Sequence, residues 1–432
     1  MTDLRRAQAS ARAARPIARH GRLPHGGIAG RIIGLVAAAL AVVLVAGVSV
    51  AGVAAYQLTS AVGKPGVKLA HLNGATAPPS VDAITGGVNM LLVGTDTRTG
   101  QSGPGESTRD SSGAGNNDVT ILMHIAEDHQ SVTVVSFPRD LLITIPRCPS
   151  PNGGTYGSVS NAMLNTTLSR GGLACTVLTI ESLTGITIPY AAEISFDGVS
   201  AMSNVVGGVT VCLASPINDP ATGLKLPAGE NTISGNTAQA FVRTRHGVGD
   251  GSDLGRISNQ QVFLSALTRK IMTEGVLKDP LKLYEIARAA TTNMTLSDSL
   301  SHVDSMVAIA LALKSVPVAN IVMLQYPVSS APSDPNRVVP TVATSRIVNQ
   351  ALQNDQRLQL TGTTGRGAVL DPNAPQTPQD PTATASTAPT GAATGAPDPG
   401  ATGPTTVTLP SSVSGQTAAQ QTCSKGNARP VG

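Results

Sequence analysis

Aromatic residues are scarce in this 432-residue chain: they make up 2% of it, and tryptophan is absent. Proteins that bind single-stranded nucleic acid stack bases on aromatic side chains, so this class is disfavoured. Charged residues are also few, at 13%, about half of the share usual in globular domains. Hydrophobic residues, at 41%, are numerous enough for a sizeable core. The length allows one large domain or two ordinary ones.

The sequence signatures of several enzyme classes are missing as well. The chain has no G-x-S-x-G nucleophile elbow, no H-E-x-x-H zinc site and no G-x-x-x-x-G-K-[ST] phosphate loop. Its four cysteines show no C-x-x-C or Cys/His spacing typical of structural zinc. We prefer a disulfide between Cys148 and Cys175; spacing alone cannot establish a pairing, and isolated buried thiols are the alternative.

The N-terminal region is first basic and then strongly apolar. Seven arginines and a single acidic residue, Asp3, precede residue 32, and residues 32–55 carry no charge. A bilayer requires about 20 apolar residues, whereas the apolar core of a cleaved signal is usually shorter. We therefore predict a transmembrane anchor over 32–55 and a basic cytoplasmic arm over 1–31, with the rest of the chain extracytoplasmic. A nucleic-acid-binding tail is the alternative for the arm.

Composition divides the remainder into three parts. Residues 56–87 are rich in Gly, Ala, Pro and Ser and are predicted to form a linker. In residues 88–356 strand-like and helical patterns alternate, which indicates a folded α/β or α+β domain. Residues 357–432 contain a long Pro/Thr/Ala/Gly-rich stretch. Such a composition buries too little apolar surface to fold, so we predict a disordered tail.

Three consecutive strand-like runs place charged residues at their ends. The first run is followed by Asp96, the second begins after Asp118, and the third leads into Arg139. Consecutive strands are usually neighbours, so in an up-down-up meander these three side chains converge at one edge of the sheet. Two carboxylates beside an arginine suit Mg²⁺ that holds phosphate oxygens. Turn or cap positions are the alternative for each aspartate alone.

Two further clusters contain anion-binding side chains. Arg243 and Arg245 lie in a run that we interpret as extended, where positions i and i+2 face the same way. Two guanidinium groups would then meet one phosphate ligand; exposed arginines are the alternative. Asp253, Arg256 and Gln260 share one face at the start of a predicted helix, with simple helix capping the alternative for Asp253. Phosphoryl transfer needs positioning and charge neutralisation more than a nucleophile, which fits this inventory.

At this point the chain resembles the LytR-CpsA-Psr family of cell-wall enzymes over most of residues 88–261. The matching segments, in the family's order, are NMLLVGTDTR (89–98), NDVTILMHI (117–125), VTVVSFPRD (132–140), IPYAAEISFDGVSAMSNVVGGVTVCL (188–213) and FVRTRHGVGDGSDLGRISNQQ (241–261). The resemblance implies a three-layer α/β/α sandwich with a central mixed sheet and a largely apolar groove for a polyprenyl chain. Many actinobacterial relatives have a second cysteine soon after the position of Cys212; none follows here, so we expect Cys212 to be unpaired.

The resemblance also implies a site and a reaction. Asp96 and Asp118 would bind Mg²⁺ (or Mn²⁺). The catalytic side chains around the pyrophosphate would be Arg139, Arg243, Arg245, Asp253, Arg256 and Gln260. A peptidoglycan sugar hydroxyl would attack the phosphorus nearer the glycan of a polyprenyl-pyrophosphate-linked glycopolymer, and polyprenyl phosphate would leave. Asn116-Asn117 stand where the family usually has Arg-Ser.

Three other functions compete with the transferase. A polyprenyl-pyrophosphate pyrophosphatase would use the same metal and arginines with water as the acceptor. A non-catalytic, membrane-anchored lipid-binding or scaffold protein would keep the apolar groove, but it would not need all the charged residues. A membrane-tethered transcription regulator is suggested only by the basic arm, which topology explains.

Overall fold

The computed structural model describes residues 66–71, 86–97, 115–273, 280–374 and 405–427. The predicted arm and anchor, and most of the predicted linker, lie outside the described residues. Among the helices of the described part, none is both long and apolar enough to cross a membrane.

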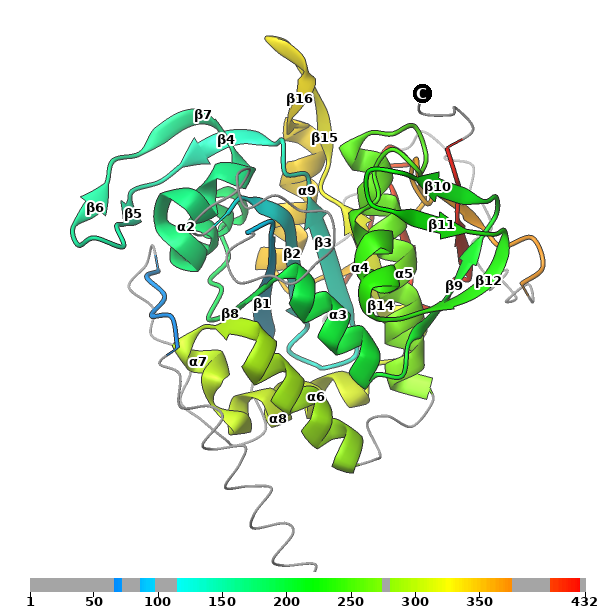
Figure 1. Ribbon diagram of the computed structural model, residues 1–432. Coiled ribbons are helices and arrows are strands. Elements are labelled where there is room, and N and C mark those ends of the chain that lie inside the picture. Colours follow the sequence, from blue (N-terminus) through cyan, green and yellow to red (C-terminus); the bar gives the residue numbers. More distant parts are fainter. Residues whose placement is uncertain (1–65, 72–85, 98–114, 274–279, 375–404, 428–432) are drawn as a thin grey trace, which may run out of the picture. The chain divides into compact units, whose positions relative to one another are not determined.

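A seven-stranded mixed sheet forms the centre of the domain (Figure 1). Its strands, in order across the sheet, are β13 (Met294–Leu296), β8 (Tyr190–Ile194), β1 (Val88–Thr95), β2 (Asn117–Ile125), β3 (Val132–Phe137), β14 (Ile321–Gln325) and β20 (Gly415–Thr417). The pairs β1–β2 and β2–β3 are antiparallel, so the predicted meander is confirmed. The pairs β1–β8 and β3–β14 are parallel. Every residue of β3 is buried, as expected for a central apolar strand covered on both faces.

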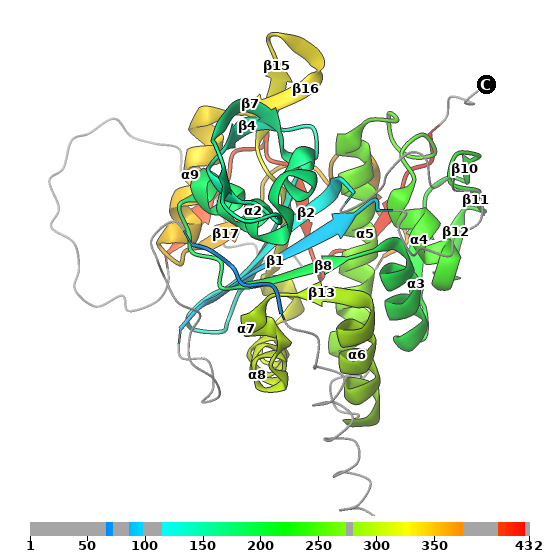
Figure 2. The same ribbon diagram turned by 60° about the vertical axis from the view of Figure 1, so that its left-hand side comes forward.

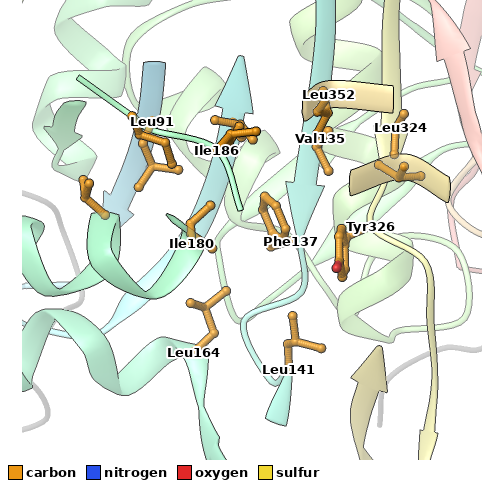
Figure 3. Close-up of a cluster of buried hydrophobic side chains, with 14 of the residues drawn as sticks. Leu91, Val135, Phe137, Leu141, Leu164, Ile180, Ile186, Leu324, Tyr326 and Leu352 are labelled. Carbon is orange, nitrogen blue, oxygen red and sulfur yellow. The ribbon is translucent and has the colours of Figure 1, made fainter. Parts of the chain in front are cut away.

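Helices α2 (Thr167–Thr184) and α9 (Val342–Gln353) cover one face of this sheet. Alternate residues of β1, Leu91 and Val93, point into this core because side chains of a strand alternate between the two faces. Figure 3 shows the cluster, in which the rings of Phe137 and Tyr326 lie 4.8 Å apart.

The opposite face packs against a second set of helices. These are α5 (Asp253–Thr273), α6 (Pro280–Asn293), α7 (Asp298–Ser301) and α8 (Val303–Lys314). Val88, Ile121 and Val134 of the sheet meet Leu300 and Ile309 in this second core. Figure 2 shows α2 and α9 on one side of the sheet and α6 to α8 on the other. The fold is therefore a mixed α/β fold with helices on both faces of its central sheet.

A smaller sheet and two more helices lie beside the central sheet. The sheet has the order β12 (Gly229–Ile233), β9 (Val209–Leu213), β21 (Thr422–Ser424) and β18 (Ala368–Leu370), and the helices are α3 (Phe196–Val205) and α4 (Gly235–Arg243). Their apolar residues form a third core with Phe263 and Ala266 of α5. The remaining elements are β4 (Leu142–Ile145), β5 (Cys148–Pro149), β6 (Thr155–Tyr156), β7 (Val159–Met163), η1 (Leu164–Thr166), β10 (Ile217–Asp219), β11 (Leu224–Leu226), η3 (Val318–Asn320), β15 (Val328–Ala331), β16 (Asp334–Pro340), β17 (Arg357–Gln359) and β19 (Thr406–Thr408).

The predicted disordered tail is wrong over its described residues. Strands β17 to β21 all lie beyond residue 356, and β20 and β21 are strands of the two larger sheets. Leu409, Val413 and Ala418 are almost fully buried and belong to the two cores of the central sheet. The short strands escape a composition-based prediction because they are stabilised by pairing with distant strands, not by local pattern. Residues 375–404, the Pro/Thr/Ala/Gly-rich stretch itself, lie outside the described residues.

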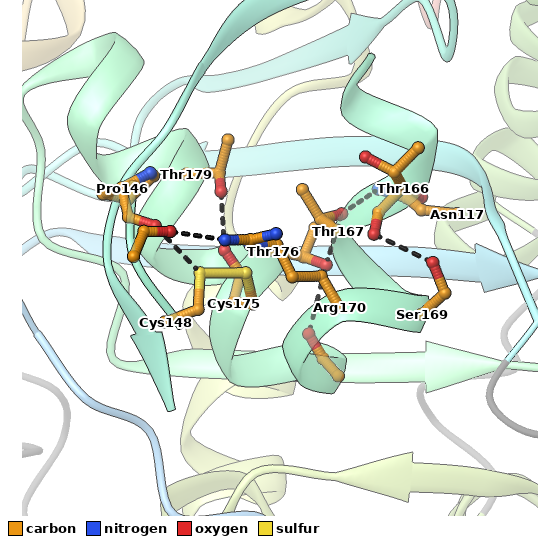
Figure 4. Close-up of a disulfide and its surroundings, with 12 residues drawn as sticks. Asn117, Pro146, Cys148, Thr166, Thr167, Ser169, Arg170, Cys175, Thr176 and Thr179 are labelled. Carbon is orange, nitrogen blue, oxygen red and sulfur yellow. Dashed lines mark hydrogen bonds between the residues drawn. A yellow bond between two sulfur atoms is a disulfide. The ribbon is translucent and has the colours of Figure 1, made fainter. Parts of the chain in front are cut away.

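Both disulfides are defined by the structure. The predicted bond between Cys148 and Cys175 is confirmed, and it ties β5 to α2 (Figure 4). The expectation that Cys212 is unpaired is wrong, because Cys212 is bonded to Cys423. These two cysteines face each other in the parallel pair β9–β21. Their partnership depends on how the chain end returns to the domain, which cysteine spacing does not reveal.

Candidate functional site

The ends of β1 and β2 bring Asp96 and Asp118 to one edge of the central sheet. Gly94 pairs with Val119, but Thr95 pairs with Asn117, so Asp118 is the extra residue of a β-bulge. Bulges often turn a side chain at the edge of a sheet. A side chain on Gly94 would approach Val119 to 2.9 Å, so the close pairing here requires glycine. The convergence predicted from the meander is therefore produced by an irregularity that the sequence pattern did not reveal.

Asp118 is the centre of an ion-pair network with two arginines. Nη1 of Arg139, which follows β3, donates to Oδ1 of Asp118 at 2.7 Å. Arg256 of α5 places Nη1 3.6 Å from Oδ2 of Asp118, and its Nη2 donates to the Asp118 carbonyl oxygen at 2.7 Å. The side chain of Arg256 is only 6% exposed. Strands β2 and β3 and helix α5 thus meet at this carboxylate.

Asp253 connects the same arginines from the first turn of α5. Its Oδ2 accepts the backbone N–H of Arg139 at 3.2 Å, and its Oδ1 lies 2.6 Å from Nη2 of Arg256. Nη2 of Arg245 lies 4.0 Å from the same Oδ1. The ion pair three residues along the helix matches the expectation that Asp253 orients Arg256.

Arg243 and Arg245 do not form the predicted pair on an extended segment. Arg243 is the last residue of α4, and Thr244 caps the end of the helix. The buried hydroxyl of Thr244 donates to Oδ2 of Asp219 at 2.6 Å. The guanidinium of Arg243 lies over the ring of Phe196, 4.1 Å from its centroid. The prediction failed because the pattern of a short run does not distinguish a helix end from a strand. The burial of Phe241 and the contact of Thr244 with Asp219 decide for the helix end.

The two arginines have different neighbours in one charged cluster: Arg243 lies over Phe196, and Arg245 lies near Asp253. Burial lowers the pKa of Arg243, while the charges of Asp118 and Asp96 raise it. Burial also lowers the pKa of Arg245, and the positive charges of Arg139 and Arg256 lower it further, while Asp253 and Asp140 raise it. An anion bound among these guanidinium groups would relieve their mutual repulsion.

The balance of charge favours an anionic ligand. Four arginines (Arg139, Arg243, Arg245, Arg256) stand against three aspartates (Asp96, Asp118, Asp253), which leaves one positive charge before any metal is added. Burial lowers the pKa of Arg139, but Asp118, Asp140 and Asp253 raise it more, so its charge is secure. Within the described part of the chain, Nε of Arg139 and Nε of Arg256 are buried without a hydrogen-bond partner.

An apolar cavity of about 270 Å³ adjoins this cluster. Its polar lining residues are Thr95, Asp118, Ser195, Ser203, Arg243, Arg256 and Gln260. The remaining lining is mostly apolar and comes from the sheet and from α3, α5 and α6, for example Leu92, Ile121, Val199, Met202, Phe263, Leu267 and Ile286. Helix α5 lines the cavity from Arg256 to Ile271, about 22 Å along the helix axis. A ligand with a charged head and a long apolar tail fits such a lining.

Gln260 supports the site more than it faces a ligand. Its Nε2 donates to the carbonyl oxygen of Val242 at 2.9 Å, next to Arg243. The side chain therefore helps to fix the end of α4, although it also lines the cavity.

The donor set suits a hard divalent cation. Asp96 follows Thr95, and Asp118 lies between Asn117 and Val119, so the two residues are at the same end of the β1–β2 pair. Magnesium is usually bound by one or two carboxylates together with phosphate oxygens and water. Asp96 is held in place by Asn116, whose backbone N–H donates to Oδ1 at 2.5 Å and whose Nδ2 donates to Oδ2 at 3.1 Å. The aspartates present therefore fit the metal implied by the sequence.

The sequence patterns missed several supporting residues. Nη1 of Arg337, on β16, pairs with Oδ1 of Asp140 at 2.9 Å, and Oδ2 of Asp140 lies 3.7 Å from Nε of Arg139. Asp140 follows Arg139 directly and was visible in the sequence, but its distant partner was not. Asn117 is fully buried and donates to Thr120, so it is a structural residue.

The arginine-rich cluster adjoins an apolar cavity, and such a lining suits an amphipathic anion. The LytR_cpsA_psr family model matches residues 57–358, and the chain belongs to the LytR-CpsA-Psr family. The cell wall biosynthesis protein LcpA of Corynebacterium glutamicum is 29% identical in an alignment of 300 positions that covers 62% of this chain and 56% of LcpA. The chain thus matches little more than half the length of this relative.

Two further similarities concern a second relative and a solved structure. The polyisoprenyl-teichoic acid–peptidoglycan teichoic acid transferase TagT of Bacillus subtilis is 27% identical over 248 residues, covering 55% of this chain and 69% of TagT. The structure of a LytR-Csp2A-Psr enzyme from Actinomyces oris is similar with a TM-score of 0.47 and 22% identity. It covers 67% of this chain and 96% of that one.

Proposed function

We propose that this chain is a membrane-anchored, extracytoplasmic phosphotransferase that moves a glycopolymer from a polyprenyl-pyrophosphate carrier to a peptidoglycan sugar hydroxyl. The observation that carries the proposal is that the guanidinium cluster adjoins the apolar cavity, which Arg243 and Arg256 of the cluster line directly. The cavity would take the polyprenyl chain, and the cluster would take the pyrophosphate. Relatives such as TagT, named as a transferase of teichoic acid from a polyisoprenyl carrier to peptidoglycan, support this substrate class.

The reaction would be a displacement at the phosphorus nearer the glycan. The acceptor oxygen would form a bond to this phosphorus, while the bond from this phosphorus to the bridging oxygen breaks. Polyprenyl phosphate would leave with the bridging oxygen, the hydroxyl proton would pass to this phosphate or to water, and the product would be a phosphodiester. Arg139, Arg243, Arg245 and Arg256 would neutralise charge on the transferring and leaving phosphates, which is the main requirement of such a step.

Mg²⁺ or Mn²⁺, held by Asp96 and Asp118, would supply further charge neutralisation at the pyrophosphate. Asp253 would keep Arg256 and Arg245 directed toward the phosphates, since it lies near both guanidinium groups. Gln260 would hold the helix end that carries Arg243.

The test uses the full-length protein in nanodiscs with a polyprenyl-pyrophosphoryl glycan, Mg²⁺ and a peptidoglycan oligomer. Mass spectrometry would detect a glycan–phosphate–peptidoglycan adduct in the wild type. Arg139→Ala should lower kcat/KM by roughly 10²- to 10³-fold, as expected when one preorganised charge donor is removed. The matched control is Arg346→Ala, which removes an exposed arginine of α9 on the other face of the sheet.

The alternatives give different products. Free glycan phosphate without an adduct would indicate the pyrophosphatase. Donor binding without any product, from several donors, would indicate a lipid-binding scaffold and contradict the proposal.

A further inference from the structure

The end of the chain packs against the elements that carry the arginine cluster. We call residues 415–427 the C-terminal strap; they lie beyond residue 358, where the family match ends. Strap strands β20 and β21 belong to the two larger sheets, and Cys423 is bonded to Cys212. Nε2 of Gln416 donates to the carbonyl oxygen of Gln261 in α5 at 2.8 Å. The strap is thus part of the folded domain and contacts α5 directly.

A buried hydrogen-bond relay leads from the strap to Arg243. The hydroxyl of Ser424 donates to Oδ1 of Asn259 at 2.6 Å, and Nδ2 of Asn259 donates to the carbonyl oxygen of Phe241 at 2.6 Å. Ser424 and Asn259 are fully buried. Phe241 lies two residues before Arg243 at the end of α4. Loss of the Ser424 hydroxyl would leave a buried amide oxygen without its donor and free Asn259 to turn.

The strap also holds the loop between Arg245 and Asp253. The backbone N–H of Gly249 donates to the carbonyl oxygen of Lys425 at 2.8 Å. Asn427 donates twice, from its backbone N–H to the carbonyl oxygen of Gly247 at 2.9 Å and from Nδ2 to that of His246 at 3.0 Å. These bonds fix the loop immediately after Arg245.

Close backbone approach makes this contact specific. A side chain on Gly426 would lie 2.1 Å from the carbonyl oxygen of Pro216, and one on Gly367 would lie 2.2 Å from that of Gly255. Gly367 in turn accepts the backbone N–H of Lys425 at 2.9 Å. The strap is therefore packed closely against Pro216, and Gly367, to which Lys425 is bonded, is packed closely against the start of α5.

We propose that the C-terminal strap is a positioning element for the reaction. Ser424, through Asn259, sets the direction of Arg243, and Asn427 sets the loop that carries Arg245. The inference rests on the proposed function in that the arginines are assigned to the pyrophosphate. It adds that residues outside the family match determine how well these arginines are preorganised.

Ser424→Ala in the full-length protein tests the relay. We expect kcat to fall about tenfold, because small misplacement of charged groups has large effects on transfer. KM for the lipid donor should stay within about twofold, since the apolar cavity is unchanged. Asn259→Ala should cause a similar loss, and the double variant should lose little more, because both changes break one relay.

Thr422→Val is the matched control. Thr422 is buried two residues earlier in β21, and its hydroxyl has no hydrogen-bond partner among the described residues. Unchanged kcat in this variant, beside the loss in Ser424→Ala, supports the relay. Wild-type kcat in Ser424→Ala, or an equal loss in Thr422→Val, overturns it.

A second variant and a second measurement cover the other outcomes. If Ser424→Ala does not fold, Asn427→Ala carries the same test at a partly exposed position; its wild-type kcat would overturn the inference. If the wild type transfers no glycan, the proposed function fails, and hydrogen exchange at the Gly249 amide decides about the strap. Exchange at least tenfold faster in Asn427→Ala than in Thr422→Val supports positioning, and equal exchange overturns it.

Discussion

Loss of the Cys212–Cys423 disulfide should destabilise the domain more than loss of the Cys148–Cys175 disulfide. The first bond spans 211 residues and the second 27. The entropy of loop closure in the unfolded chain then gives a stabilisation of about 5.5 kcal/mol for the long loop and about 3.5 kcal/mol for the short one. A typical domain is stable by only about 5–15 kcal/mol, so the long-range bond is a large part of the total.

The measurement compares two double variants, Cys212→Ala with Cys423→Ala and Cys148→Ala with Cys175→Ala. Both would be prepared as full-length proteins in mild detergent and unfolded with urea. Far-UV circular dichroism would follow the transition, because the chain has no tryptophan for fluorescence. The free energy of unfolding comes from linear extrapolation to zero urea.

The first variant should lose about 2 kcal/mol more than the second, because the two losses differ only by the logarithm of the loop lengths. An equal or smaller loss in the first variant would refute the reasoning. In that case residual structure would already hold the chain end near β9 in the unfolded state, and the bond would remove little entropy from that state.

Three further changes test the site and its surroundings. Arg256→Ala removes a buried cation that lies between Asp118 and Asp253, so we expect a loss of about 3–5 kcal/mol in the free energy of unfolding; a loss below about 1 kcal/mol by urea unfolding would contradict this. Burial raises the pKa of Glu193 from 4.5 to about 7. The folded state therefore holds this proton more tightly, and stability should fall by about 3 kcal/mol as pH rises from about 4.5 through 7. Glu193→Gln should not show this fall. If the free energies of unfolding of the two proteins changed in parallel between pH 5 and 8, the assignment of the fall to Glu193 would be wrong. Asp96→Asn should weaken Mg²⁺ binding, measured by calorimetric titration without substrate, by at least roughly 10-fold, because loss of a charged ligand should cost no less than loss of a residue that only supports a ligand; an unchanged affinity would remove Asp96 from the metal site.

The convergence of Asp96, Asp118 and Arg139 could be predicted because it depends on neighbouring strands. Apolar runs indicated three strands, and a meander of consecutive strands puts their alternate ends at one edge of the sheet. The ion pair between Arg139 and Asp118 confirms that the two residues meet. The bulge at Asp118 was not predictable, because an extra residue changes the pairing but leaves the hydrophobic pattern unchanged.

Arg243 and Arg245 were recognised as anion-binding candidates, but their backbone was wrongly interpreted as extended. A run of five residues fits a strand and a helix end equally well when only its periodicity is considered. The contacts that decided between them are long-range. Thr244 bonds to Asp219, and the carbonyl oxygen of Phe241 accepts from Asn259.

The sequence by itself determined the α/β character of the domain, the order of its charged motifs and the residue types that suit a phosphate ligand. These features depend on local pattern, on chain order and on the chemistry of single side chains. Only the tertiary structure decided that Cys212 pairs with Cys423, and that the chain end returns to hold α5 and the loop after Arg245. The strands at the chain end, such as β20 and β21, are short and have weak local preferences. Because partners up to about 200 residues away stabilise them, no local pattern predicts them.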